Sequence, residues 1–348
     1  MTELANIIPP HASNKPPVTN VRFTPDDSTT VLDAHLIKTF RACQQKLNLF
    51  DVQHVVPKTM KAAPAFGISM HEGIAVFREA RKDGLPYDQA YEKGAVALLT
   101  AYKKYMPVEA QSEVKQDEKR SAKNALRLFT GFVQHFEPAG YEYLYVEVPF
   151  ALHLGEIQVA DKWSQADTGI IEEYTTKQVI YVGIIDAILR DHGVIRVNDI
   201  KSSSWPISDA SLNVYKMDQG LKGYTVAARE LLGVDTGYAS VHAMWVQGEP
   251  KSKNAKPLDE YFHNKDLYWD DAQIAEWRID TLRTATRIEQ CKLSGVWEHD
   301  NAASCGAWGG CEYLPVCSVT PAARANIIEL DYDRGIWTPL ESERMQKL

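Results

Sequence analysis

The stretch VIYVGIIDAILRDHGVIRVNDIKSSS, from Val179 to Ser204, decides the fold class of this chain. It holds two runs rich in Val and Ile on either side of a polar segment, Arg190–Gly193, which is typical of a β-hairpin. Both runs are apolar at nearly every position, so we expect central strands covered on both faces. Asp186, Asp199 and Lys201 interrupt them. Buried charges are unfavourable unless they are paired or bind a metal ion, so this hairpin is the first candidate for a functional site.

The pairing register of the hairpin determines whether these charges meet. If Leu189 pairs with Val194, Asp186 and Asp199 are diagonal neighbours on one face, about 7–8 Å apart, with Lys201 one step beyond. A register slip of one residue would move Asp186 to the opposite face and separate the group. We therefore expect a hairpin loop with an even number of residues.

Two converging carboxylates repel each other and favour a divalent cation between them. Mg²⁺ is typically bound by one or two carboxylates and keeps several waters for a substrate phosphate. A nearby ammonium group, such as that of Lys201, can orient the attacking water or stabilise charge on the phosphate. The alternative is a structural Asp–Lys pair at the ends of two strands.

The pattern Gly183-x-x-Asp186 followed by Asp199-x-Lys201 resembles the core of the PD-(D/E)XK nuclease superfamily. The resemblance implies an α/β fold, a restriction-endonuclease-like mixed β-sheet flanked by helices, with a helical N-terminal part and a Cys-rich C-terminal tail. It also implies that Asp186 and Asp199 bind Mg²⁺ or Mn²⁺, with the backbone carbonyl of Ile200 as a further ligand. Lys201 would position the hydrolytic water.

A second match lies in the segment GISMH, residues 67–71, which resembles the helical G-x-x-x-H motif of RecB-like nucleases. In that family the His helps to bind the metal, and neutral imidazole is a suitable ligand. Periodicity alone places His71 beside the apolar stripe of a helix, where a lone His is more often a packed core residue. The resemblance favours the ligand role for His71.

Further site residues follow from the same resemblance. RecB-like enzymes often carry a Glu on the strand before the Asp strand, which implies that Glu147, in an apolar strand expected over residues 143–154, is a supporting acid. The family also has a Gln-x-x-x-Tyr motif on the next helix. Here Gln219 and Tyr224 are one residue further apart, which rotates them by roughly 140° about the helix axis. Gln219 would steady the site, whereas Tyr224 has simple packing as its alternative.

The cysteines indicate a second metal site. Three of the five, Cys305, Cys311 and Cys317, lie in a Gly-rich segment near the C-terminus, and thiolate clusters select zinc or iron–sulfur. The residues leave Cys43 and Cys291 as candidates for a fourth ligand. By periodicity, Cys43 lies on the apolar stripe of a helix expected from residues 30–33 to Phe50, so packing is its default role.

AddB-type and CRISPR-associated exonucleases, which the chain resembles, carry a [4Fe–4S] cluster with one Cys upstream of the nuclease motifs and three downstream. That resemblance implies Cys43, Cys305, Cys311 and Cys317 as the ligands, with zinc as the alternative. In the family, two residues commonly separate the first two downstream cysteines, whereas five residues separate Cys305 from Cys311 in this chain.

Length and composition limit the possible function class and domain organisation of the chain. The chain has 348 residues and a net charge of −8, which argues against a protein that coats nucleic acid non-specifically. No apolar run is long enough for a membrane span and no signal peptide opens the sequence, so we expect a cytoplasmic protein. We expect a flexible arm over 1–29, a nuclease domain over 30–320 and a tail over 321–348. Within the domain we expect a mainly helical part (30–137), a catalytic sheet core (140–250) and a C-terminal helix with the Cys cluster (270–320).

The expected function is that of a Mg²⁺- or Mn²⁺-dependent DNA nuclease, more an exonuclease than an endonuclease, acting in recombination or repair. Its expected partners are single-stranded DNA or duplex ends, with a helicase or recombination protein as a candidate partner and no membrane. The competing interpretation is a non-catalytic DNA-binding or scaffold protein that keeps the nuclease fold and a structural zinc or iron–sulfur site.

Overall fold

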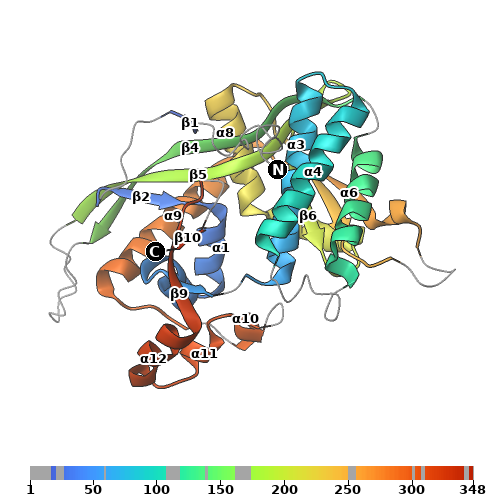
Figure 1. The fold of residues 1–348 in the computed structure, drawn as a ribbon. Helices are drawn as coiled ribbons and strands as arrows, with labels where there is room; N and C mark the ends of the chain where they lie inside the picture. The colour runs from blue at the N-terminus through green and yellow to red at the C-terminus, as the bar shows by residue number, and fades with distance from the viewer. Residues whose placement is uncertain are drawn as a thin grey trace, which may run out of the picture. The chain divides into compact units, whose positions relative to one another are not determined.

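The computed structural model describes residues 17–20, 27–58, 60–106, 118–137, 140–160, 174–249, 256–299, 302–306, 310–340 and 345–347 (Figure 1). Contacts divide this part of the chain into two compact units. Thr59–Pro149 and Ile184–Asp270 belong to unit 1, and Pro17–Lys58, Phe150–Gly183 and Asp271–Leu348 belong to unit 2. The candidate nuclease residues all lie in unit 1 and the cysteines all lie in unit 2.

A mixed β-sheet confirms the predicted fold class. Its strands follow the order β1-β4-β5-β6-β7-β8, with β2 paired to β5. The β5–β6 and β7–β8 pairs are antiparallel, whereas β6 and β7 are parallel. The strands are β1 (Val18–Thr19), β2 (Thr29–Leu32), β4 (Glu142–Ala160), β5 (Tyr174–Asp191), β6 (Val194–Ser203), β7 (Tyr238–Trp245) and β8 (Phe262–Tyr268).

The hairpin closes more tightly than the sequence predicts. Strand β5 ends at Asp191 and β6 begins at Val194, so the loop is His192-Gly193, with φ of 46° and 84°. Positive φ at both central residues is what a type I′ turn requires, and such turns match the twist of the flanking strands. The expected pairing with a four-residue loop was therefore wrong, because Leu189 pairs with Arg196. The loop length remains even, so the side chains keep the predicted faces.

Gly193→Ala is expected to destabilise unit 1 by about 1–2 kcal/mol, because an L-residue is strained in the left-handed region. A Cβ at Gly193 would meet nothing within 4 Å, so conformation and not crowding is what the substitution tests. Gly306→Ala is the matched control, since Gly306 also has open space and no positive φ. Equal free energies of unfolding for the two variants would contradict the type I′ assignment.

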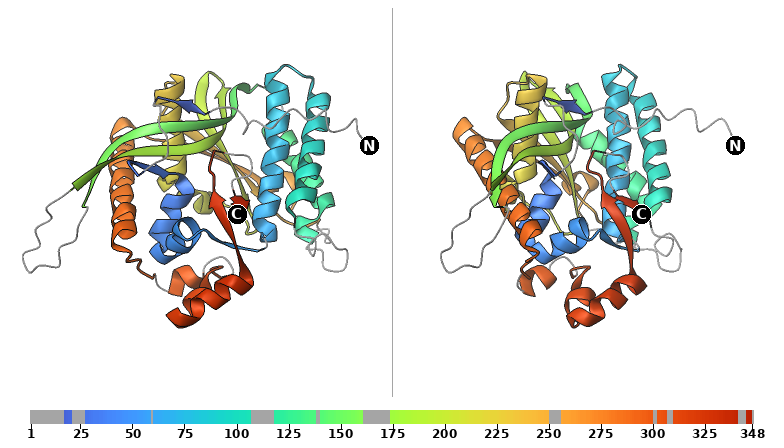
Figure 2. Two further views of the ribbon diagram at one scale, coloured as in Figure 1. Left: turned by 60° about the vertical axis from the view of Figure 1, so that its left-hand side comes forward. Right: turned by 90° about the vertical axis from the view of Figure 1, so that its left-hand side faces the viewer.

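Helices cover both faces of β6 and β7 in unit 1 (Figures 1 and 2). One face packs against α3 (Ala62–Lys82) and α6 (Ala122–Phe136), with α4 (Tyr87–Tyr105) packed on these two to complete a three-helix layer, and the other packs against α8 (Gln219–Leu232). The three-helix layer shares one apolar core with the sheet, which includes Phe66, Ile74, Phe129, Phe132, Ile200 and Met244. Shorter helices of this unit are η4 (Glu118–Arg120), α7 (Asp209–Leu212), η5 (Asn213–Met217) and η6 (Leu258–Tyr261).

Two glycines bring the backbones of α3 and α4 into contact. A Cβ on Gly94 would lie 2.7 Å from the carbonyl oxygen of Gly73. Since real Cβ atoms do not approach that closely, both helices need glycine at this crossing. The close approach holds α3, which carries His71, against its neighbour in the helical layer.

Unit 2 contains Pro17–Lys58, the parts of β4 and β5 within Phe150–Gly183, and the C-terminal helices. Its long helix α9 (Asp271–Ser294) packs along this part of the sheet, where Trp277 meets Tyr181 edge to face at 5.3 Å and Arg278 donates to the carbonyl of Leu154 at 3.0 Å. A second sheet has the order β10-β9-β3. The remaining elements are α1 (Ala34–Ala42), α2 (Gln44–Leu47), η3 (Asn48–Val52), β3 (Val55–Pro57), α10 (Ala302–Gly306), α11 (Leu314–Cys317), α12 (Pro321–Asp331), β9 (Tyr332–Trp337) and β10 (Met345–Lys347).

The single helix expected from residues 30–33 to Phe50 was wrong. Thr29–Leu32 pairs with β5 as strand β2, and Asp33 caps the N-terminus of α1 by accepting the Leu36 N–H at 2.7 Å. Cys43 then interrupts the helix with extended backbone, φ −166° and ψ 118°. The apolar stripe is real, but the chain changes direction at the cysteine.

Two further expectations bear on the ends of the chain and on membranes. Of the expected arm, residues 1–16 and 21–26 lie outside the described residues, whereas Val18–Thr19 forms β1. Beyond residue 320, α12 and β9 are ordered elements. Among the helices described here, none combines the length and apolarity that a bilayer crossing requires.

Candidate nuclease site

The two hairpin aspartates lie side by side where β5 and β6 separate. The last backbone pair of the ladder is Ala187 with Asn198, and Asp186 and Asp199 are the next residues on each strand. Here the Asp186 Oδ2 accepts the backbone N–H of Ile200 at 2.9 Å. A carboxylate thus takes an N–H that a backbone carbonyl would accept in a continued ladder, which holds Asp186 beside β6.

Asp199 and Lys201 form a close ion pair on the same face of β6. Lys201 Nζ lies 2.5 Å from Asp199 Oδ2, and the lysine side chain is 39% exposed whereas that of the aspartate is 4% exposed. Asp199 Oδ2 makes no hydrogen bond of ordinary geometry within the described residues. A buried carboxylate oxygen that has an ion-pairing ammonium beside it but no ordinary hydrogen bond keeps acceptor capacity for a cation or a water.

Burial and charge act against each other in this group. Burial raises the pKa of Asp199 to about 7, Lys201 opposes that rise and Asp186 adds to it. Burial opposes the charge of Lys201, but Asp199, Asp186 and Tyr224 together raise the pKa of its ammonium above the usual value. Lys201 is therefore cationic at neutral pH, while Asp199 is poised to lose or gain a proton near pH 7.

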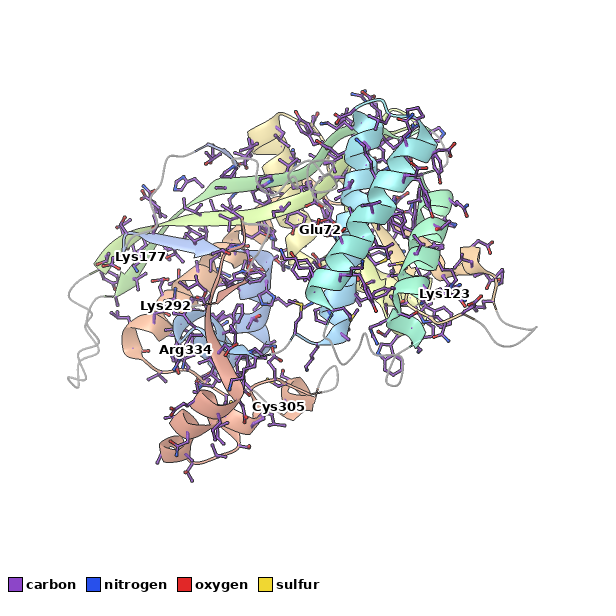
Figure 3. The ribbon with its side chains drawn as sticks, in the orientation of Figure 1. Glu72, Lys123, Lys177, Lys292, Cys305 and Arg334 are labelled. Atoms are coloured by element: carbon purple, nitrogen blue, oxygen red, sulfur yellow. The ribbon has the colours of Figure 1, made fainter. Side chains whose placement is uncertain are left out.

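Helix α3 brings His71 to this pair. Its Nδ1 lies 3.5 Å from Asp186 Oδ2, and its side chain is 33% exposed. Gly67, four residues earlier, faces β6, where a Cβ would lie at an ordinary contact distance of 3.5 Å from Ser202 Oγ. Glu72, the residue that follows His71 on this helix, is labelled in Figure 3. The G-x-x-x-H segment and the acidic hairpin therefore do converge.

The remaining sequence-derived residues occupy less direct positions. Glu147 is buried in β4 with φ of 46°, a conformation that non-glycine residues rarely adopt and that is associated with functional sites. Tyr224 is close enough to Lys201 to raise the pKa of its ammonium. The Gln219 amide donates to the carbonyl of Met217 at 3.2 Å. The roles predicted for these residues, and the ligand role of the Ile200 carbonyl, stay predictions.

Two residues near the site were missed from sequence. Burial raises the pKa of Tyr215, and the charges of Lys201 and Asp199 also act on its hydroxyl. Asp218 contributes to the raised pKa of Asp199 and caps α8 by accepting the Leu221 N–H at 2.9 Å. Tyr215 lies on a short 3-10 helix without a motif, but an Asp just before an apolar helix is an N-cap signal that could have been read.

In unit 2, four cysteines gather around the break between α1 and α2. The Ser304 hydroxyl donates to the carbonyl of Ala42 at 3.0 Å, which brings the segment of Cys305, labelled in Figure 3, to the residue before Cys43. The Cys311 N–H donates to the Cys305 carbonyl at 2.8 Å. Burial raises the pKa of the Cys317 thiol, and Cys311, Cys43 and Cys305 raise it further.

The fifth cysteine has different electrostatic neighbours. The Cys291 thiol donates to Gln44 Oε1 at 3.3 Å, and the charges acting on it come from Arg287 and Glu298. The structure therefore associates Cys43, and not Cys291, with the three C-terminal cysteines. All five are free thiols.

Neither group has the geometry of a complete metal site. Among the described residues, no set of three or more His, Cys, Asp or Glu side chains is arranged to hold a metal ion. The side chains of His71, Asp186 and Asp199 are nevertheless hard or borderline donors of the kind that Mg²⁺ and Mn²⁺ accept. The buried Asp199 oxygen without an ordinary hydrogen bond fits that chemistry.

Comparison with known proteins identifies the family. The family model described as "PD-(D/E)XK nuclease superfamily" matches residues 34–318, most of the chain. This chain belongs to the PD-(D/E)XK nuclease superfamily. The matched range contains the acidic hairpin, His71 and all five cysteines.

Other comparisons add little to this assignment. No curated protein matches the chain. Among solved structures, "Crystal structure of SSO0001" aligns over 83% of this chain and 95% of that chain, with 15% sequence identity and a TM-score of 0.24. Membership of the PD-(D/E)XK superfamily therefore rests on the family match, together with the mixed sheet and its flanking helices.

Proposed function

We propose that this protein is a Mg²⁺- or Mn²⁺-dependent DNA nuclease of the RecB-like branch, acting as an exonuclease on DNA ends in recombination or repair. The observation that carries the proposal is the convergence of His71, Asp186, Asp199 and Lys201 in unit 1. His71 comes from helix α3, whereas the other three residues come from the β5–β6 hairpin, which lies far from that helix in the sequence. A purely structural Asp–Lys pair would not need a second buried carboxylate and an imidazole beside it.

The charge state of the site fits a divalent cation. Burial raises the pKa of Asp199 and the nearby Asp186 carboxylate raises it further, so a positive partner would stabilise the ionised form of Asp199. His71, Asp186, Asp199 and the carbonyl of Ile200 would hold the metal. When bound, the metal would supply Lewis-acid stabilisation of a phosphate and acidification of a water.

Each residue has a separate task in phosphodiester hydrolysis. The ionised Asp199 carboxylate accepts a hydrogen bond from the attacking water and orients it toward phosphorus. The Lys201 ammonium, which is cationic at neutral pH, lies 2.5 Å from Asp199 and stabilises negative charge that develops on the phosphate oxygens. Asp186, fixed by the Ile200 N–H, keeps its second oxygen for the cation.

Digestion of end-labelled single-stranded and double-stranded DNA with Mg²⁺ or Mn²⁺ tests the proposal. We expect metal-dependent release of label from linear DNA and no cleavage of a closed circle. The Lys201→Ala variant should lose the activity, and Lys123→Ala, which removes an exposed lysine from helix α6 of the same unit, is the control. Wild-type cleavage by Lys201→Ala would exclude the mechanism. DNA binding by a wild-type protein that never cleaves would favour the non-catalytic scaffold.

We also propose that Cys43, Cys305, Cys311 and Cys317 bind a structural [4Fe–4S] cluster. Four free thiols whose charges act on one another support this proposal, as does the helix break that brings Cys43 to them. Thiolates are the ligands that such clusters and zinc require. The binding free energy would contribute to the folding of unit 2.

Anaerobic purification distinguishes the alternatives at the cysteine group. Iron and sulfide in equal amounts, with a broad absorption band in the blue, would support the cluster. A colourless protein that contains zinc would instead indicate that the cysteines form a zinc site. Cys291→Ser is the matched control, because it should keep the metal content, whereas Cys317→Ser should lose it.

A further inference from the structure

A fully buried polar network joins helix α3 to strand β6 inside unit 1. The guanidinium of Arg78 donates from Nη1 to Asn198 Oδ1 at 2.8 Å and from both Nε and Nη2 to Glu137 Oε1 at 3.0 Å. Its Nη2 also lies 3.2 Å from His242 Nδ1. Arg78 is 0% exposed, and its three partners are buried as well. Buried charge of this kind needs a reason beyond packing.

The network is placed on the same helix face as the candidate metal ligand. Arg78 follows His71 by seven residues, which is close to two helical turns and about 10 Å along the axis. Between them, Ile74 packs into the core that includes Ile200, the residue whose N–H holds Asp186. Asn198 is the neighbour of Asp199 in β6. The network therefore fixes α3 to the strand that carries the acidic pair.

A second contact lies at the other end of the same helix segment. Gly67 lies beside Ser202 of β6, where a Cβ would be at an ordinary contact distance of 3.5 Å from the serine Oγ. His71 is located between this contact and the Arg78 network, and its Nδ1 is 3.5 Å from Asp186 Oδ2. The position of the imidazole relative to the carboxylate thus depends on how α3 packs on β6, and the Arg78 network is the polar attachment between them.

Arginine suits this position better than lysine. A guanidinium presents several donors in a rigid fork, so it can bond three partners on different elements at once. Because it only donates, His242 Nδ1 must accept. Burial lowers the pKa of His242 well below its usual value, with a further contribution from Arg78, so the ring is neutral as this contact requires. Phe136 stacks on the same ring at 4.1 Å.

We propose that Arg78 is a positioning residue for the metal site, which sets the place of His71 beside Asp186 and thereby the affinity of the site for its divalent cation. The inference rests on the proposed function, because it assumes that His71 is a ligand. Residues that orient metal ligands commonly change metal affinity by about 10–100-fold when they are replaced.

Mn²⁺ binding to the full-length protein without DNA, measured by calorimetry, tests the inference. Arg78→Lys keeps the charge and loses the fork, and we expect its dissociation constant for Mn²⁺ to rise about tenfold. In a His71→Ala background, the same substitution should cause no further change, since the two residues act as one unit. Phe129→Leu, in the same apolar core, is the control for a loss of stability alone.

The outcomes separate this inference from the proposed function. Arg78→Lys with a lower melting temperature but an unchanged Mn²⁺ dissociation constant would overturn the positioning role while the nuclease proposal stands. An equal loss of affinity in the wild-type and His71→Ala backgrounds would also overturn it, because Arg78 would then act elsewhere. A wild-type protein that neither binds Mn²⁺ nor cleaves DNA would overturn both.

Discussion

Asp199→Asn is expected to reduce DNA cleavage by about 10²–10³-fold while it stabilises the folded protein above pH 7. The substitution keeps the shape of the side chain and removes its charge. Without that charge the site loses a metal ligand, the partner of Lys201 and the acceptor for the attacking water. Cleavage of end-labelled DNA with Mn²⁺ measures the loss, and addition of Mn²⁺ should no longer raise the melting temperature.

The stability change follows from the pKa of Asp199. Burial raises it from 3.8 to about 7, so the folded state holds a proton that the unfolded state has already released. The stability associated with this proton is fully present below about pH 4 and is lost as the pH rises toward 7. Above the raised pKa the ionised carboxylate is a penalty on the folded state, before any compensation from a bound cation. Lys201 remains protonated throughout this range and does not change the slope.

Asparagine carries no charge at any pH and escapes that penalty. The melting temperature of Asp199→Asn should therefore exceed that of the metal-free wild type by several degrees at pH 8 and match it near pH 4. Asp191→Asn is the control, since Asp191 lies on the same hairpin but its carboxylate is 2.6 Å from the exposed ring of His192 and is not enclosed in the core. If Asp199→Asn is less stable than wild type at pH 8, the ionised Asp199 carboxylate does not destabilise the folded state.

The hairpin and its charges could be predicted because they depend on local information. Alternation along β5 and β6, and an even loop, suffice to place Asp186 and Asp199 on one face. The register could not be predicted, because it depends on whether His192 adopts a positive φ. Asn-Gly or Asp-Gly would have signalled the tight turn, whereas Asp-His-Gly does so only weakly.

The features that sequence reasoning missed depend on contacts between distant residues. The break at Cys43 occurs inside an unbroken apolar stripe, which periodicity alone reads as one helix. Arg78 stands beside the polar segment Glu79–Lys82, where a charged residue is normally solvated. Its partners lie 59, 120 and 164 residues away, so only the folded structure brings them together.

Arg78→Met is expected to destabilise unit 1 by about 3–5 kcal/mol, the usual effect of removing one partner from a buried ion pair. Glu137 would keep a carboxylate in the core, where its Oε2 already lacks a hydrogen-bond partner within the described residues. Chemical denaturation followed by circular dichroism measures the loss. Arg127→Met is the matched control, because Arg127 bonds the neutral groups of Asn124 and Gln247 and should lose much less stability.

The stability that Arg78→Met loses should also depend on pH. The sign of that dependence identifies the buried Glu137 carboxylate as the cause. Burial raises the pKa of Glu137 even though Arg78 lowers it, so removal of Arg78 raises that pKa further. A raised carboxyl pKa gives stability at low pH that is lost as the pH rises, so Arg78→Met should be much closer to wild type at pH 5 than at pH 8. Arg78→Met combined with Glu137→Gln should recover part of the stability at pH 8, since the uncompensated charge is then absent. A deficit that is equal at both pH values, and unchanged by Glu137→Gln, would assign it to lost packing and not to the buried carboxylate.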